Sequence, residues 1–294
     1  MATPTDLLDP RTAYRALRDQ LGSIRRVYLA RPAVPRLEDL EGRSDVVALI
    51  HGFFQTPNIW DVMEDRLGHD GFGVVTFHLA GLLGRFNTRR VDECARTVGR
   101  ALRDLAAEHP DLRIHVVGHS KGGIIARRFV QHQGGDEVVT SLTTLGTPHH
   151  GTPLAAIGMA VMGFGTLRSS ARELMPGSQM IEALGRDTFP AHIPLTSVYS
   201  TSDVVTPARS ARLRPRPGEE HHLTNVEVRK VGHSELVWDA GVYRIVREHI
   251  EQASEVAEQR AATAEASALA LAAPLRPCPI EGVLAAHASR LAAK

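Results

Sequence analysis

The sequence predicts an α/β fold in which a mostly parallel central sheet is covered by helices on both faces. Short, continuously apolar segments alternate along the chain with longer segments of helical periodicity, and this rhythm is typical of parallel sheets. The apolar segments 46–50 and 114–117 are rich in β-branched residues, as is usual for strands buried on both faces. A chain of 294 residues is long enough to bury the large core that this architecture needs.

The first half of the chain predicts helices and strands in alternation. Strands are expected at 24–29, 46–50, 73–79 and 113–118, and helices at 5–21, 58–67 and 87–109. The helix at 87–109 is long and amphipathic, and Pro110 ends it because proline cannot continue a helix. Cys94 falls at helical spacing with Val91 and Val98, so we expect a buried, unreactive thiol there.

The second half continues this alternation to about residue 252. A helix is expected at 121–132, strands at 138–145, 193–200 and 226–231, and a last helix from about 235 to 252. The apolar residues of the last helix recur on one side, as they do in helices that pack on a sheet. We therefore predict one α/β domain over residues 1–254.

Two regions break the alternation. Residues 151–190 are a long, apolar insertion with interspersed glycines, and insertions of this length are usually functional or disordered. We interpret this insertion as a helical cap or lid, with ordinary core packing as the alternative. Residues 255–294 are rich in alanine and contain three prolines after residue 273. We expect them to form a separate helical extension, in which no function is readable.

Composition excludes several classes of function. A formal net charge of +1 and an aromatic content of 5% give no basis for binding nucleic acid. No apolar run is long enough to span a membrane, and the N-terminus shows no secretory signal. Two cysteines are too few for a disulfide framework, and their spacing fits no metal motif. The expected location is the cytoplasm.

The segment Gly118-His119-Ser120-Lys121-Gly122 carries the strongest chemical signal. Gly-x-Ser-x-Gly between an expected strand and an expected helix is the context of a nucleophile elbow, where a sharp, strained turn lifts the serine hydroxyl above the sheet. A Cβ at Gly118 or Gly122 would crowd the strand and helix at this turn. A flexible Gly/Ser loop is the alternative, and the flanking elements favour the elbow.

A serine nucleophile needs a base, and the base needs an orienting carboxylate. In hydrolases with this elbow, the acid and then the histidine follow the serine in the chain. Asp203 follows the expected strand 193–200, and His233 lies between the expected strand 226–231 and the last helix. Ligands of α/β sheets bind beyond such strand ends. We therefore predict Ser120, Asp203 and His233 as a catalytic triad.

Other residues compete for the acid and base roles. Aspartate among Ser and Thr is also common as a turn-capping residue, which is the alternative for Asp203, and Glu219 and Asp239 are the next candidates for the acid. Among the histidines that follow the serine, His149, His150, His221 and His222 are the other candidates for the base. The first pair precedes the acid, and the second pair lies in a polar loop where a surface role is expected.

Acyl transfer also requires donors for the negative charge that develops on the substrate oxygen. The backbone N–H of Lys121 lies at the start of the expected helix, where anionic charge is favoured. The second donor is expected to be the N–H of Phe53, in the loop after the strand 46–50. Gly52 would let this backbone come close, and we expect His51 to hold the loop without taking part in the chemistry.

Three motifs together resemble those of the α/β-hydrolase lipases and esterases: His51-Gly52-Phe53, Gly118-His119-Ser120-Lys121-Gly122-Gly123 and Gly146-Thr147-Pro148-His149-His150-Gly151-Thr152. The chain is most similar to the bacterial triacylglycerol-lipase and GPI-inositol-deacylase-like group, over about residues 46–250. The Gly-Thr-Pro-His-x-Gly segment is the most discriminating of the three.

The resemblance implies an α/β-hydrolase fold, Ser120, Asp203 and His233 as the triad, and Phe53 and Lys121 as oxyanion donors. It also implies that residues 174–178 belong to the cap. Two features depart from the group's pattern. Secreted members carry a signal peptide, which this chain does not show. Many members bind a structural calcium, but Asp239 has no clear partner for one, so no metal is predicted.

The sequence thus predicts a serine hydrolase that cleaves carboxylic esters through an acyl-enzyme intermediate and needs no cofactor. The apolar insertion indicates an acyl pocket, with lipid-like or medium-chain esters as substrates. Four residues are expected to bind substrate: Phe54, Met159, Met162 and Phe164. The expected partner is the ester itself, with transient contact to a lipid interface. An acyltransferase on the same fold, a binding protein without activity and a peptidase are the alternatives.

Overall fold

The computed structural model describes residues 40, 42–79, 81, 86–153 and 166–272. Within them lies one sheet of six strands in the order β2-β1-β3-β4-β5-β6, and all neighbouring strands are parallel. The strands are β1 (Asp45–Ile50), β2 (Gly73–Thr76), β3 (Arg113–His119), β4 (Val139–Leu145), β5 (Leu195–Ser200) and β6 (Leu223–Val228). The predicted fold class is confirmed.

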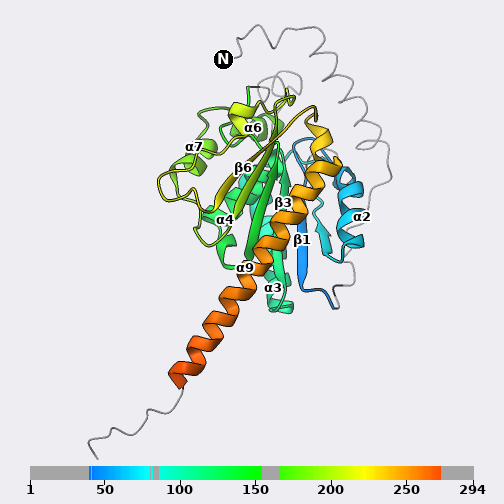
Figure 1. The fold of residues 1–294 in the computed structure, drawn as a ribbon. Helices are drawn as coiled ribbons and strands as arrows, with labels where there is room; N and C mark the ends of the chain where they lie inside the picture. Colours follow the sequence, from blue (N-terminus) through cyan, green and yellow to red (C-terminus); the bar gives the residue numbers. More distant parts are fainter. Residues whose placement is uncertain (1–39, 41, 80, 82–85, 154–165, 273–294) are drawn as a thin grey trace, which may run out of the picture. The chain divides into compact units, whose positions relative to one another are not determined.

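Helices cover both faces of this sheet, as Figure 1 shows. They are η2 (Pro57–Trp60), α2 (Asp61–His69), α3 (Val91–Glu108), α4 (Lys121–His132), η4 (Gly135–Glu137), α6 (Thr166–Glu173), α7 (Gln179–Arg186), α8 (Ala208–Ala211), η5 (Ser234–Val237) and α9 (Ala240–Ala272). By its internal contacts the chain divides into two units, 1–254 and 255–294. The described part of the second unit is the last part of α9.

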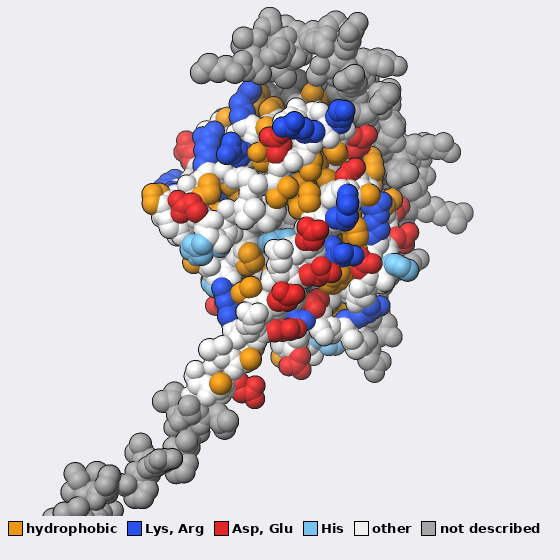
Figure 2. Space-filling model, viewed as in Figure 1, with side chains coloured by type: hydrophobic (Ala, Val, Ile, Leu, Met, Phe, Trp, Pro, Cys, Tyr) orange, Lys and Arg blue, Asp and Glu red, His pale blue; other side chains and the backbone are white. Residues whose placement is uncertain are grey.

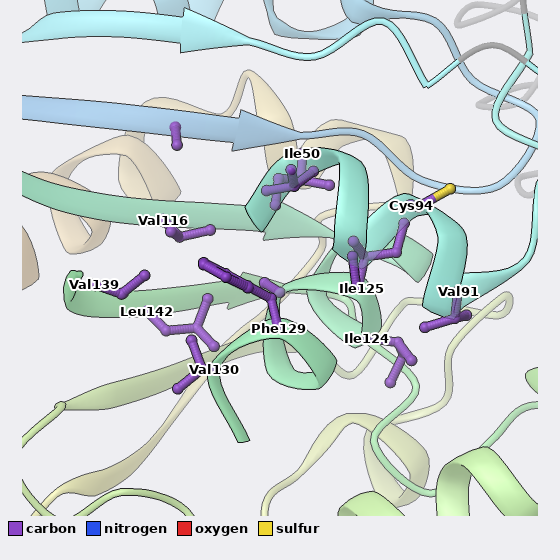
Figure 3. Packing of buried hydrophobic residues seen from close by; sticks show 14 of the residues in the cluster. Ile50, Val91, Cys94, Val116, Ile124, Ile125, Phe129, Val130, Val139 and Leu142 are labelled. Carbon is purple, nitrogen blue, oxygen red and sulfur yellow. The ribbon is translucent and has the colours of Figure 1, made fainter. Parts of the chain in front are cut away.

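The core consists of two clusters, one on each face of the sheet. Because side chains alternate along a strand, Val46 and Ala48 of β1 join the cluster under α3, α4 and α7, whereas Val47 packs with α2 and the first turns of α9. Figure 3 shows part of the first cluster, with Ile125 and Phe129 of α4 beside side chains from β3 and β4. This packing fixes α4, and with it the turn that precedes α4.

The strand order predicts a binding site at the carboxyl ends of the strands. The chain forms β1, adds β2 on one side of it, and then returns to add β3 on the other side. In open α/β sheets, ligands bind beyond the carboxyl ends of the strands where the order reverses in this way. The loop after β1 and the turn after β3 therefore meet at the expected place for a binding site.

Several predicted boundaries are wrong, each for a physical reason. The last strand spans 223–228 instead of 226–231, because β6 is an edge strand of the described sheet in which Leu223 alone is buried, and it lacks a continuous apolar run. The helix expected from residue 87 begins at Val91, since residues 87–90 form a hydrogen-bonded loop. The last helix continues through the expected boundary to Ala272, because its alanine-rich sequence has high helix propensity.

The described end of the insertion belongs to the core. Leu174, Met180, Ile181 and Leu184 are buried in the cluster that contains α3 and α4, which is the ordinary packing alternative for this part. Residues 154–165 lie outside the described residues, so the lid stays a prediction for them. The elements expected at 5–21 and 24–29, and the end of the C-terminal extension after residue 272, also lie outside.

Charged side chains of both signs share the surface. Acidic and basic groups occur together on the face viewed in Figure 2, in keeping with the formal net charge of +1. The described residues of that face thus form no single-signed field of the kind that attracts nucleic acid. Among the helices that the structure describes, none is both long enough and apolar enough to cross a membrane.

Candidate active site

Ser120 occupies a sharp turn between β3 and α4. Its backbone has φ 54° and ψ −122°, a conformation that costs a non-glycine residue roughly 1–3 kcal/mol. Two backbone hydrogen bonds hold the turn: Ser120 N–H donates to the Leu145 carbonyl at 2.9 Å, and Gly123 N–H donates to the Ser120 carbonyl at 3.1 Å. The strained geometry expected of a nucleophile elbow is therefore present at this serine.

Two glycines of the motif lie too close to neighbouring backbone atoms for any larger residue to fit. A Cβ on Gly122 would lie 1.9 Å from the Ile50 carbonyl oxygen, and a Cβ on Gly118 would lie 2.6 Å from Cα of Gly123. These distances are far below van der Waals contact, and the atoms that would be met belong to the backbone. The start of α4 can therefore pack directly on β1 and β3, which brings Ser120 close to the loop after β1.

Asp203 and His233 form a short, buried pair at the same edge of the sheet. Nδ1 of His233 donates to Oδ2 of Asp203 at 2.7 Å, and their side chains are 8% and 0% exposed, respectively. The other carboxylate oxygen accepts the N–H groups of Val205 and Thr206, both at 2.8 Å. These bonds fix the carboxylate, and the carboxylate fixes the imidazole with Nε2 free to accept a proton.

The His233–Asp203 pair lies beside the elbow, but within the described structure it forms no hydrogen bond with Ser120. Gly146, at the end of β4, is so close that a Cβ there would be 3.0 Å from Oδ2 of Asp203 and 3.2 Å from Nδ1 of His233. Among the interactions of the described residues, Ser120 Oγ and His233 form no hydrogen bond. Such catalytic bonds are often long when no substrate is bound, so the Ser120–His233 bond stays a prediction.

The loop after β1 runs next to Ser120. A Cβ on Gly52 would lie 3.0 Å from Cβ of Ser120, which explains the glycine at this position. Of the hydrogen bonds that the described residues make, none uses the backbone N–H of Phe53 or of Lys121. Both N–H groups are therefore available to a ligand near the serine, as an oxyanion hole requires.

Side chains that the sequence analysis did not single out hold this loop. Oε1 of Gln55 accepts the N–H of Gly52 at 2.7 Å and lies 3.0 Å from Nδ1 of His119. The other ring nitrogen of His119 donates to the His233 carbonyl at 3.0 Å, and the two rings are 4.7 Å apart. Burial holds the pKa of His119 well below its usual range. His119 thus links the loop after β1 to the backbone of the predicted base.

Asn87 makes a second set of bonds to the same loop. Its side-chain amide donates to the His51 carbonyl at 2.9 Å. Its backbone N–H donates to Gln55, and its backbone carbonyl accepts from Phe54, both at 3.2 Å. His51 is buried, and burial lowers the pKa of its ring to about 3, so it stays neutral as expected of a residue with a supporting role. A sequence signal for Asn87 would have been its place just before an amphipathic helix, but loops commonly carry such residues.

Of the four residues predicted to bind substrate, one is among the described residues. Met159, Met162 and Phe164 are outside the described residues. Phe54 is described: it has φ 56° and stacks on Phe86 with ring centroids 4.6 Å apart.

The competing acids and bases have structural partners of their own. Glu219 accepts the backbone N–H groups of Phe189 and Arg216, and Asp239 accepts from Val242 at the start of α9. His149 is buried and lies 3.1 Å from a guanidinium nitrogen of Arg127. His150 contacts the Arg212 carbonyl, and His221 and His222 contact one another.

Comparisons with known proteins agree with this fold. Residues 45–169 match the family model of the α/β hydrolase fold. No curated protein matches the sequence. A lipase of Bacillus licheniformis is similar in structure, with a TM-score of 0.59, 15% identity and coverage of 75% of this chain and 99% of that chain.

Two further solved structures are similar at comparable identity. A soluble variant of the monoglyceride lipase of Saccharomyces cerevisiae has a TM-score of 0.55, 15% identity and coverage of 76% of this chain and 96% of its own. A thermostable carboxyl esterase of Bacillus coagulans has a TM-score of 0.52, 16% identity and coverage of 71% and 91%, respectively. At such identities the likeness concerns the fold. The chain therefore has the α/β-hydrolase fold.

Proposed function

We propose that the protein is a serine hydrolase that cleaves carboxylic esters. The observation that carries the proposal is the buried 2.7 Å bond between His233 and Asp203, at the same sheet edge as a serine in a strained turn. An oriented imidazole beside a serine in a sharp turn is the arrangement that activates a hydroxyl for attack. The free N–H groups of Phe53 and Lys121 stabilise the negative charge that develops on the substrate oxygen.

In the proposed mechanism, Nε2 of His233 removes the proton from Ser120 as its oxygen attacks the ester carbonyl. The N–H groups of Phe53 and Lys121 bind the oxyanion, and His233 then gives the proton to the departing alcohol. Water, activated by the same imidazole, releases the acid from the acyl-enzyme. Asp203 orients the imidazole and stabilises its charged form throughout.

The proposed substrates are lipid-like or medium-chain esters. The similar structures are a lipase, a monoglyceride lipase and a carboxyl esterase, and the insertion at 151–190 has the apolar composition of an acyl pocket. We place the chain with the bacterial triacylglycerol-lipase and GPI-inositol-deacylase-like group on its Gly-Thr-Pro-His-x-Gly segment. Brief contact with a lipid interface would deliver such substrates.

The test is Ser120→Ala, assayed with p-nitrophenyl acetate and p-nitrophenyl octanoate. We expect the wild type to prefer the octanoate, and the variant to lose roughly a million-fold in kcat because the nucleophile is gone. Ser267→Ala, on the exposed surface of α9, is the matched control and should leave kcat unchanged. A fluorophosphonate probe should label the wild type and not Ser120→Ala. Near-wild-type turnover by Ser120→Ala would reject the proposal.

A further inference from the structure

The side chain of Lys121 is buried next to the proposed nucleophile. It is 0% exposed, and its ammonium group donates to Oδ1 of Asn87 at 3.0 Å, to Oγ of Ser170 at 2.7 Å and to the carbonyl of Arg89. Among the described residues, no carboxylate forms an ion pair with it. Taking an ammonium group out of water costs several kcal/mol. Burial of this ammonium group therefore lowers the stability of the fold, and filling space does not explain a lysine at this position.

One acceptor of this ammonium group, Asn87, connects it to the loop after β1. Asn87 is the side chain that donates to the His51 carbonyl, and its backbone bonds to Phe54 and Gln55. The ammonium group also lies 5.5 Å from the centre of the Phe53 ring, within the range of a cation–π interaction. Lys121 thus reaches the loop after β1 by two routes, one through Asn87 and one through the ring of Phe53.

We propose that the Lys121 side chain is a positioning residue: through Asn87, its ammonium group sets the place of the loop 51–55 and hence of the Phe53 N–H. The inference rests on the proposed function, in which that N–H binds the oxyanion. Three acceptors require three donors, and only the charged ammonium has three. Loss of the proton removes one donor and loosens the loop.

The surroundings of the ammonium group make its charge sensitive to pH. Burial lowers the pKa of Lys121 from 10.5 to about 8. The charged and titratable groups around it are Arg89 on the preceding loop, Glu93 and Cys94 on α3, and Glu173 on α6. Within the described structure, the side chains of these four residues form no direct bond to the ammonium group, and Arg89 accepts from it only through its backbone carbonyl. We therefore expect kcat to fall above about pH 8 as the ammonium group loses its proton.

The experiment compares Lys121→Met with the wild type. Methionine keeps the length and apolar stem of lysine, and an apolar replacement of a buried charge is often tolerated by the fold. We expect kcat to fall about 10- to 100-fold, less than for outright loss of an oxyanion donor, with KM within about threefold because ground-state binding is unchanged. The alkaline fall in kcat near pH 8 should disappear in this variant.

Two further variants separate the route through Asn87 from a general loss of packing. Asn87→Leu should reduce kcat to a similar extent. The double variant should lose much less than the product of the two single losses, because both changes break the route through Asn87. Cys94→Ala is the matched control: its Sγ contacts the same Oδ1 of Asn87 at 3.6 Å without belonging to the route, so kcat should stay within about twofold.

Amide hydrogen exchange tests the inference independently of activity. In Lys121→Met, exchange should become faster in the peptide covering residues 51–60 and stay unchanged in strands β3 and β4. If the wild type hydrolyses no ester but this exchange pattern appears, the proposed function fails and the positioning role stands. Unchanged exchange in residues 51–60, or a Lys121→Met enzyme with wild-type kcat and pH profile, would overturn the inference.

Discussion

The two sides of Ser120 are built differently. On one side, the proposed base and acid are side chains, His233 and Asp203, joined by one short bond on loops beyond β6 and β5. On the other side, the proposed oxyanion donors are the backbone N–H groups of Phe53 and Lys121. The loop that carries Phe53 is held by polar side chains, Gln55 within the loop and Asn87 from another loop. Where side chains act, the identities of the acting residues determine the chemistry. Where backbone groups act, the residues that hold the backbone in place determine it.

The electrostatics of the two sides also differ. The acid–base side carries the carboxylate of Asp203, which favours a positive imidazole. The oxyanion side carries the N-terminus of α4 and the buried ammonium group of Lys121, and both favour negative charge. The proposed transition state separates charge in the same sense, with positive charge on His233 and negative charge on the substrate oxygen. The two sides are thus complementary to one charge distribution.

The largest effect after loss of the nucleophile is expected on the acid–base side. Asp203→Asn should lower kcat on the order of ten-thousand-fold, because the amide cannot hold the productive tautomer of His233. The unfolding temperature should change little, since Asn keeps an oxygen that can accept from Val205 and Thr206. Steady-state kinetics with p-nitrophenyl octanoate measures the first, and calorimetry the second. A loss below tenfold would assign the acid role to another carboxylate.

An intermediate effect is expected on the oxyanion side. A Cβ on Gly52 would lie 2.8 Å from Oε1 of Gln55 and 3.0 Å from Cβ of Ser120, so Gly52→Ala should displace the loop that carries Phe53. We expect kcat to fall about 100-fold, the usual cost of losing one oxyanion donor, with little change in KM.

The matched control for this change is another glycine-to-alanine substitution. Gly185 lies within α7, and a Cβ there would meet nothing within 4 Å. Gly185→Ala should keep kcat and stabilise the fold by roughly 0.5–1 kcal/mol, as alanine does within a helix. Equal kinetics for the two alanine variants would contradict the proposed position of the oxyanion loop.

The same contrast explains how much the sequence could predict. The strands β1 and β3 and the elbow were predicted because short runs rich in β-branched residues and a Gly-x-Ser-x-Gly motif are local signals. The supporting bonds of Gln55 to His119 and of Asn87 to Lys121 join residues 64 and 34 positions apart. No local pattern marks such pairs, since each residue alone is an ordinary polar residue of a loop, strand end or helix start.

Edges of elements were harder to predict for a related reason. The strand β6 has one neighbour and a partly exposed sequence, Leu-Thr-Asn-Val-Glu-Val, so its apolar signal is weak. Most described residues of α9 after residue 254 are exposed, so the helix propensity of alanine, and not packing, continues the helix past the predicted boundary. Central strands are buried on both faces, and this burial requires apolar residues that can be recognised in the sequence.

The smallest effect on activity, with a clear effect on stability, is expected at the opposite end of β1. Asp45 begins that strand, and its carboxylate accepts from Arg113 at 2.6 Å and from Ser254 at 2.6 Å, with His115 3.0 Å away. Burial alone would raise the pKa of Asp45, but these hydrogen bonds together hold it well below 3.8. A depressed carboxylate pKa stabilises the fold at pH values above 3.8, and this stability is lost as the pH falls further.

Asp45→Asn should therefore lower the free energy of unfolding by about 2 kcal/mol at pH 7, and should weaken the dependence of stability on pH below about 4. Glu227→Gln is the control, because its pair with Arg229 is exposed on the edge strand and should contribute less than about 0.5 kcal/mol. Urea unfolding at pH 7 and pH 3 measures both. Because Asp45 lies at the amino end of β1, kcat of the folded Asp45→Asn enzyme should equal that of the wild type. A large loss of kcat would mean that the two ends of the strand are coupled.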